Sequence, residues 1–143
     1  RKGNNKTNEL PQIFARIPPS LPALKRAQKI TSVAAEYGFD WPRIADVRKK
    51  LCEECDEFYA ALDGGQKDKI EEEIGDIFFT LVNLCRFLGV DAHHALTRTI
   101  NKFLRRFAEI EKNLSAQGKS LKEATLQDMD KIWNRAKEKE EQA

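Results

Sequence analysis

The stretch that decides the fold is KLCEECDEFYAALDGGQKDKIEEEIGDIFFTLVNL, residues 50–84. Its apolar residues recur every three or four positions on both sides of DGGQ at 63–66, which is the spacing of amphipathic helices. The two glycines favour a tight turn, so the second helix must return antiparallel to the first. Acidic residues stand at the borders of both apolar stripes rather than opposite them. We therefore expect a helix hairpin that carries carboxylates where its core begins.

The composition is that of a helical globular domain. The 143 residues are 41% hydrophobic and 34% charged, with only seven Gly and five Pro. This composition, with almost no alternating Val, Ile and Thr, predicts an all-α fold long enough to bury a core. The formal net charge of +2 gives no electrostatic case for nucleic acid or a membrane as the main partner. There is no apolar run of about 18 residues and no signal peptide, so we expect a cytoplasmic protein.

Helix start and stop signals along the chain predict five helices packed as an antiparallel bundle. We expect them at about 21–37 after an N-cap at Ser20, 41–62 after Asp40, 67–88, 92–116, and from about 125 to 139. The segment TLQD, residues 125–128, predicts a capping box for the last helix. Residues 1–19 are expected to be a flexible polar leader or linker, and residues 20–143 a single domain. Because the chain starts at Arg1 rather than Met, we expect a piece of a longer protein.

The cysteines predict neither a disulfide framework nor a structural zinc site. Cys52, Cys55 and Cys85 are an odd number for disulfides. Cys52 and Cys55 form a CxxC pair, but a structural zinc ion needs four converging ligands, and both His lie far downstream. We expect buried, reduced thiols.

Two acidic pairs lie on matching flanks of the two central helices. On each helix one acid lies about 60°, and the next about 120°, to the same side of the apolar centre. The pairs are Glu54 and Glu57 on the first helix and Glu73 and Asp76 on the second. A turn centred on Gly65 places Glu54 level with Asp76 and Glu57 level with Glu73. The expected apolar centres are Leu51, Cys55, Phe58 and Leu62, and Ile70, Ile74, Ile77 and Leu81.

If these flanks converge, four carboxylates meet at the edge of an apolar core and repel one another, and a divalent cation removes that repulsion. All-oxygen ligands suit Mg²⁺, with Mn²⁺ as an alternative, and an ion that keeps water ligands recruits substrate phosphates. The competing interpretation is two acid-rich faces in solvent without a metal ion. A ferritin-like di-iron site fits worse, because it needs a Glu-x-x-His motif on each of two helices.

Basic and polar residues continue the same flanks. Lys50 precedes Glu54 by one turn, and Thr80 and Asn83 follow Asp76 by one and two turns. The helix expected at 92–116 carries a cationic stripe opposite its apolar stripe, consisting of Arg98, Lys102, Arg105 and Arg106. Such a stripe beside carboxylates that bind a metal ion suits a polyphosphate ligand. The alternative is a solvated helix face with local ion pairs.

Together these residues resemble the MazG-type nucleoside triphosphate pyrophosphohydrolases. The resemblance rests on EECDE at 53–57, EIGD at 73–76, LVNLCRFLG at 81–89 and NKFLRRF at 101–107, and it covers most of the chain. It is greatest to the C-terminal catalytic half of two-domain members. Because members of the family are all-α enzymes that dimerise through a shared helical bundle, the resemblance implies a bundle completed by homodimerisation.

The resemblance also implies a reaction and its residues. A nucleoside triphosphate would be cleaved between its α and β phosphates, giving nucleoside monophosphate and pyrophosphate, with Mg²⁺ held by acidic side chains. The implied metal ligands are Glu54, Glu57, Glu73 and Asp76, with Glu53 in a supporting role because it points away from the others. The implied or expected substrate contacts are Lys50, Asn83, Lys102, Arg105, Arg106 and Trp133. In a dimer, Lys102, Arg106 or Trp133 could serve the partner's nucleotide, and Trp133 has a packing role as its alternative.

Our hypothesis is metal-assisted hydrolysis, in which one carboxylate helps to take the proton of the attacking water and Lys and Arg stabilise the leaving pyrophosphate. A helical dimerisation or regulatory module that binds nucleotide or metal without hydrolysis is the main alternative. A relative selective for dUTP, dCTP or phosphoribosyl-ATP is a second alternative. The basic helix and the full EExxE pattern favour broad specificity.

Overall fold

The computed structural model describes residues 11–143, and this part of the chain is all-helical, as the sequence predicts. A short 3₁₀ helix, η1 (Gln12–Phe14), precedes five α-helices. These are α1 (Ala23–Glu36), α2 (Ile44–Gly64), α3 (Lys67–Phe87), α4 (Ala92–Ala116) and α5 (Leu126–Gln142). The chain divides into two compact units, residues 1–93 and 94–143, with the boundary near the start of α4. The prediction of a single domain over 20–143 stays a prediction.

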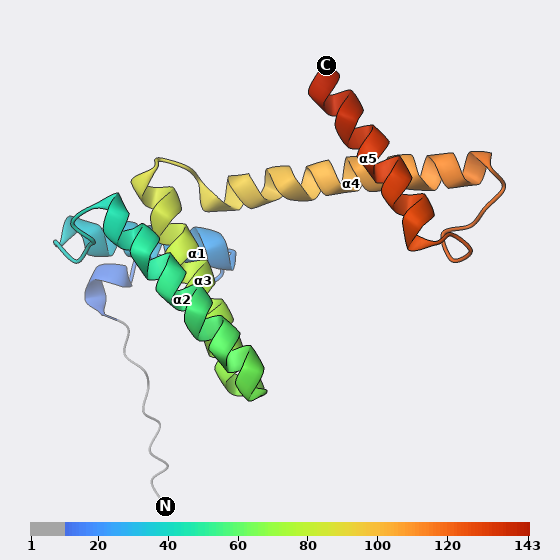
Figure 1. Cartoon of the computed structure of the whole chain (residues 1–143). Coiled ribbons are helices and arrows are strands. Elements are labelled where there is room, and N and C mark those ends of the chain that lie inside the picture. Colours follow the sequence, from blue (N-terminus) through green and yellow to red (C-terminus); the bar gives the residue numbers. More distant parts are fainter. Residues whose placement is uncertain (1–10) are drawn as a thin grey trace, which may run out of the picture. The chain divides into compact units, whose positions relative to one another are not determined.

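In the first unit, α2 and α3 form the predicted antiparallel hairpin (Figure 1). The turn is tighter than DGGQ suggests, because Asp63 and Gly64 still belong to α2. Gly65 ends the helix with φ 68°, a left-handed conformation that only glycine adopts without steric cost. Its amide donates to the carbonyl oxygens of Ala61 and Leu62, and α3 begins two residues later.

The buried side of the hairpin differs from the predicted one. On α2 the buried residues are Val47, Glu54 and Ala61, each seven positions from the next, which is the spacing of a packed helix seam. On α3, Glu73 and Thr80 are buried at the same spacing. Of the eight residues expected at the apolar centres, Leu62, Ile74 and Leu81 remain 46%, 38% and 42% exposed, and the other five are half-buried. The expectation that acids only flank the core is therefore wrong for Glu54 and Glu73, which lie in the seam itself.

Helix α1 packs against α3, and η1 contacts α1. The Gln28 side chain on α1 donates to the carbonyl oxygen of Val90 at 2.9 Å and accepts from the amide of Ala92 at 2.8 Å. This one side chain therefore fixes the link between α3 and the first residue of α4. Of the expected polar leader, residues 1–10 lie outside the described residues, whereas residues 11–19 contain η1.

Two predicted helix caps are wrong, and proline is the reason in both cases. Helix α1 begins at Ala23 with Pro22 as its N-cap, so Ser20 is not the cap. Helix α2 begins at Ile44 rather than after Asp40. The ring of Pro42 disfavours helical geometry at the preceding residue, so residues 40–43 stay irregular.

The second unit consists of α4 from His94 onward and α5. Ile110 and Leu114 of α4 and Ile132 of α5 form its buried core, against which Phe107, Met129 and Trp133 pack. At the start of α5 the predicted capping box is present. The Thr125 hydroxyl accepts from the Asp128 amide, and the Asp128 carboxylate accepts from the Thr125 amide.

All three cysteines are free thiols. Cys55 and Cys85 are half-buried, but Cys52 is exposed, so the expectation of buried thiols is wrong for Cys52. Between residues 11 and 143, no helix combines the length and the apolar character that crossing a membrane requires.

Candidate metal and nucleotide site

Three glutamates of the hairpin converge. Glu54 and Glu57 lie one turn apart on α2, and Glu73 approaches them from α3. One carboxylate oxygen from each lies within 4.8 Å of those of the other two. The antiparallel pairing of α2 with α3 brings these residues to one level, because the turn at Gly65 sets the register.

Two of the three carboxylates are almost completely buried. Glu54 is 4% exposed and Glu73 is 2% exposed. Each has one oxygen on a lysine, with Lys50 Nζ 2.8 Å from Glu54 Oε1 and Lys69 Nζ 2.9 Å from Glu73 Oε1. Among the described residues, the second oxygen of each has no hydrogen-bond partner. A buried, unpartnered carboxylate oxygen is costly, so these two oxygens are candidate ligands for a cation.

The cluster perturbs the ionisation of its members. The negative charges of Glu54 and Glu73 raise the pKa of Glu57. Burial raises the pKa of Asp76, and the charges of Glu54 and Glu73 add to that effect. The Lys69 ammonium, which donates to Glu73, lowers the pKa of that carboxyl despite its burial. Asp76 therefore belongs to the same electrostatic neighbourhood, although it lies outside the tight group of three.

This donor set fits a hard divalent cation. It offers only carboxylate oxygens, and no thiol or imidazole takes part, which excludes the usual zinc ligands at this position. The two unpartnered buried oxygens are the groups that such an ion would satisfy. Glu54, Glu57 and Glu73 are thus the residues able to hold it, with Asp76 nearby.

Two hollows adjoin the carboxylates. A pocket of about 640 Å³ is lined by Lys50, Glu54 and Asp76 together with aromatic side chains. A second pocket, of about 490 Å³, is lined by Glu57, Lys69 and Glu73. The carboxylates thus line two hollows, of which the first is largely apolar.

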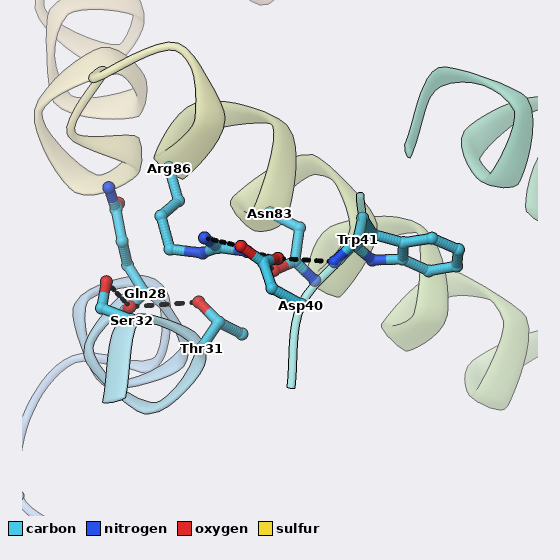
Figure 2. A network of polar contacts seen from close by, with 7 residues as sticks. All are labelled: Gln28, Thr31, Ser32, Asp40, Trp41, Asn83 and Arg86. Atoms are coloured by element: carbon cyan, nitrogen blue, oxygen red, sulfur yellow. Dashed lines mark hydrogen bonds and ion pairs between the residues drawn. The ribbon is translucent and has the colours of Figure 1, made fainter. Parts of the chain in front are cut away.

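Asn83, a predicted substrate contact, belongs to a polar network at the first pocket (Figure 2). Arg86 donates to both carboxylate oxygens of Asp40, one of them at 2.9 Å, and to Asn83 Oδ1 at 3.1 Å. Asp40 also accepts from the Trp41 amide at 2.8 Å. The guanidinium of Arg86 holds the pKa of Asp40 below its usual value. Asp40, predicted only as a helix cap, instead joins the loop before α2 to α3.

The remaining predicted site residues lie elsewhere. Glu53 is half-exposed and lies 4.0 Å from Lys50 Nζ, and it is not one of the three converging glutamates. Lys102, Arg105, Arg106 and Trp133 lie on α4 and α5 in the second unit. There Arg106 donates to Glu140 through Nε at 3.1 Å and Nη2 at 2.7 Å, and lies over the Trp133 ring. Trp133 also packs against Phe103, so a packing role is present for it.

Lys69 is the residue that the sequence reasoning missed. Its signal is a repeat: KLCEE at 50–54 and KIEEE at 69–73 place a lysine four residues before the buried glutamate of each helix. In both copies the lysine bonds the buried glutamate and lies within 4.0 Å of the exposed one before it. Arg86 was also missed, because its role depends on a loop 46 residues away.

Known proteins are similar to this chain. Residues 44–111 match the family described as the MazG nucleotide pyrophosphohydrolase domain. The chain is 44% identical over 126 residues to a nucleoside triphosphate pyrophosphohydrolase of Escherichia coli strain K12, covering 87% of this chain and 48% of that protein. It is 37% identical over 136 residues to a nucleoside triphosphate pyrophosphohydrolase/pyrophosphatase MazG of Thermotoga maritima, covering 95% of this chain and 51% of that protein. The uncharacterized protein YabN of Bacillus subtilis is 48% identical over 71 residues, covering 50% of this chain and 14% of that protein.

The chain thus spans about half the length of the first two relatives. The matched family region, 44–111, contains all of α2 and α3, and with them the three converging glutamates, Asp76 and both lysines. Residues 44–111 of this chain therefore match the MazG nucleotide pyrophosphohydrolase domain family.

Proposed function

We propose that this chain hydrolyses nucleoside triphosphates to nucleoside monophosphate and pyrophosphate, with Mg²⁺ as the cofactor and Mn²⁺ as a substitute. The observation that carries the proposal is the pair of buried glutamates, Glu54 and Glu73, each with one unpartnered oxygen, beside a largely apolar pocket. Sequence similarity to proteins named as nucleoside triphosphate pyrophosphohydrolases supports the same reaction.

In this proposal Glu54, Glu57, Glu73 and Asp76 are the metal ligands. When bound there, the ion would neutralise phosphate charge and orient an attacking water. One of the carboxylates accepts the proton of that water, and Lys50 and Lys69 place positive charge next to the phosphates. Glu53, half-exposed, supports the orientation of Lys50.

We further propose that Lys102, Arg105 and Arg106 contact the triphosphate and that Trp133 lies near the nucleotide, in the same subunit or in the partner of a homodimer. Arg106 would have to exchange the Glu140 carboxylate for a phosphate oxygen. Such an exchange is chemically conservative, because the guanidinium fork binds both anions in the same way.

The test is a product assay. The chain is incubated with MgCl₂ and each nucleoside triphosphate in turn, and nucleoside monophosphate and pyrophosphate are quantified, with EDTA as the control. We expect both products in equal amounts. Formation of nucleoside diphosphate and phosphate, or binding without turnover, would overturn the proposal.

Variants of the cluster test the assignment of residues. Glu54→Gln and Asp76→Asn should each lower kcat/KM by more than about 100-fold, because each removes a charged ligand. Glu71→Gln on the exposed side of α3 is the matched control and should keep turnover. Far-UV circular dichroism should be the same for all three variants. Full activity in Glu54→Gln or Asp76→Asn would exclude that residue from the site.

A further inference from the structure

The pocket of about 640 Å³ extends from the carboxylates along α3. Asp76, Thr80 and Asn83 all line it, at positions i, i+4 and i+7 of one helix face. Seven residues of helix rise about 10 Å. A 5′-nucleotide spans a comparable length from its phosphate to the far edge of its base, so a phosphate held near Asp76 would leave the base near Asn83.

The walls between these two ends suit a flat aromatic ligand. Phe39, Trp41 and Phe79 line the pocket, and Phe14 of η1 joins them. Nucleobases stack on aromatic rings, which stabilises their binding. The pocket is large enough for a purine or a pyrimidine, since ligand pockets typically have volumes of about 300–1,000 Å³.

The contact with Arg86 fixes the orientation of the Asn83 side-chain amide, and so decides which of its atoms can bind a ligand (Figure 2). Arginine has only donors, so the oxygen of the Asn83 amide must face it, and the Arg86–Asn83 contact is to Oδ1. The amide nitrogen, Nδ2, is then directed the other way. Asn83 is 9% exposed, so this donor belongs to the pocket wall rather than to the outer surface.

Two hydroxyl groups that line the same pocket are not available as hydrogen-bond donors to a ligand. The Thr31 hydroxyl donates to the Gln28 carbonyl oxygen at 3.1 Å, and the Thr80 hydroxyl donates to that of Asp76 at 2.8 Å. Both hydroxyls therefore present only acceptor lone pairs to a ligand. The charge of Asp40 is matched by Arg86, so this end of the pocket suits an uncharged ligand.

We propose that this pocket binds the nucleotide base and that Asn83 Nδ2 donates a hydrogen bond to the keto oxygen O4 of a pyrimidine or O6 of a purine. Arg86 and Asp40 are positioning residues, because they act by holding the Asn83 amide in one orientation. The proposal rests on the function proposed above for the choice of a nucleotide as the ligand. It adds a preference for keto bases (uracil, thymine and guanine) over amino bases (cytosine and adenine).

The decisive experiment measures kcat/KM for UTP, CTP, GTP and ATP in the native chain and in Asn83→Asp. The aspartate still accepts from Arg86, but its second oxygen replaces the Nδ2 donor. The base oxygen that accepted a hydrogen bond from Asn83 would then face a carboxylate oxygen that repels it. We expect the UTP/CTP and GTP/ATP ratios both to fall by about tenfold or more, the effect of losing one hydrogen bond to a buried group. Unchanged ratios would overturn the proposal.

Comparing UTP with dUTP in the same two proteins tests whether Asn83 contacts the ribose instead of the base. The ratio of UTP to dUTP should move less than twofold in Asn83→Asp. If it moves more than the UTP/CTP ratio, Asn83 contacts the sugar and the base assignment is wrong.

The positioning role is tested by Arg86→Gln, with Arg43→Gln as the matched control. Arg43 is an exposed arginine whose contact is with Asp46, one turn along α2. In Arg86→Gln we expect KM for UTP to rise more than kcat falls, and the UTP/CTP ratio to move toward one. A lower Tm with an unchanged ratio would show that Arg86 only anchors the loop.

Binding without turnover separates this inference from the proposed function. UMP and CMP are titrated calorimetrically into the full chain in EDTA. Tighter binding of UMP, reduced in Asn83→Asp, supports the base site even if no triphosphate is hydrolysed. Equal binding of UMP and CMP by the native chain would overturn the inference and leave the hydrolysis proposal standing.

Discussion

Glu54 and Glu73 occupy positions where an antiparallel helix pair ordinarily buries valine or leucine. Each lies in the α2–α3 seam, and the only neutralising contact that the described residues give it is one lysine. Such an arrangement lowers stability unless a cation satisfies the remaining oxygens. At the scale of single residues, we therefore expect folding and cation binding to be coupled.

Divalent cations should stabilise the folded chain. An ion that binds only the folded state stabilises it by about 2.7 kcal/mol at one hundred times its Kd. We expect Tm, measured by differential scanning fluorimetry, to be higher in MgCl₂ than in EDTA. The increase should disappear in Glu73→Gln and persist in Glu72→Gln, its exposed neighbour. An equal increase in both variants would place the ion elsewhere.

Removing one charge from the cluster should stabilise the chain when no cation is present. Among the described residues, Glu57 forms no salt bridge with a lysine. The charges of Glu54 and Glu73 raise its pKa, so its ionised form is disfavoured in the folded state. At neutral pH, Glu57→Gln should therefore raise Tm in EDTA by a few degrees. At a pH where the native Glu57 is already protonated, the difference should vanish. A lower Tm for Glu57→Gln in EDTA would contradict the repulsive geometry.

At the scale of elements, the capping box decides where α5 begins. Thr125→Ala removes the acceptor of the Asp128 amide and should lower the free energy of unfolding by about 1 kcal/mol, the usual effect of losing an N-cap. Ser120→Ala is a matched control, since its hydroxyl donates to the side chain of the exposed Glu123 and not to a helix cap. Chemical denaturation measures both. Equal losses would show that the cap contributes nothing specific.

The capping box should also make the stability of the fold depend on pH. Bonds from the Thr125 hydroxyl and amide lower the pKa of Asp128, so the ionised carboxylate is favoured in the folded state. Its stabilising contribution is complete above the unfolded-state pKa near 4 and is lost as pH falls through the lower folded-state pKa. The stability difference between the native chain and Asp128→Asn should shrink over that acidic range.

Gln28 should matter more than a typical surface glutamine. Its amide bonds both Val90 and Ala92, so Gln28→Leu leaves one backbone acceptor and one donor without their partner. We expect a loss of about 1–3 kcal/mol in the free energy of unfolding. Lys29→Leu, on the exposed side of α1, is the control and should lose less than about 0.5 kcal/mol. A loss no greater than the control's would show that the link before α4 is held by other contacts.

At the scale of the whole molecule, large apolar side chains remain exposed along α3. Ile74, Phe78 and Leu81 share one face at positions i, i+4 and i+7, and are 38%, 54% and 42% exposed. A contiguous exposed apolar face marks an interaction surface, and the homodimer that we propose would cover it.

We therefore expect Phe78→Asp to convert a dimer into a monomer, as measured by light scattering after gel filtration. Tyr37→Asp is the control, because Tyr37 is 69% exposed and lies outside that face. A native chain that elutes as a monomer, or a Phe78→Asp variant that remains dimeric, would remove this face from the interface.

Local chemistry in the sequence was enough to predict several features. Helical periodicity gave the five helices, a pair of glycines gave the hairpin, and TLQD gave the cap of α5. These features depend on contacts within a few residues. The prolines at 22 and 42 were also visible, but their effect on the helix starts was underestimated, because a following proline restrains the residue before it.

The sequence by itself determined that this chain is helical, and its periodicity and turn length predicted Glu54 level with Asp76 and Glu57 level with Glu73 on one hairpin. The group that converges in the structure is Glu54, Glu57 and Glu73. Only the tertiary structure decided which side of the hairpin is buried. A helical wheel gives the angle of each side chain but not the neighbouring helix that covers it. The glutamates predicted at the flank therefore lie in the seam, whereas Ile74 and Leu81, predicted at the centre, are exposed. The Asp40–Arg86–Asn83 network likewise depends on a contact between residues 46 positions apart, Asp40 and Arg86, and no local pattern can encode such a contact.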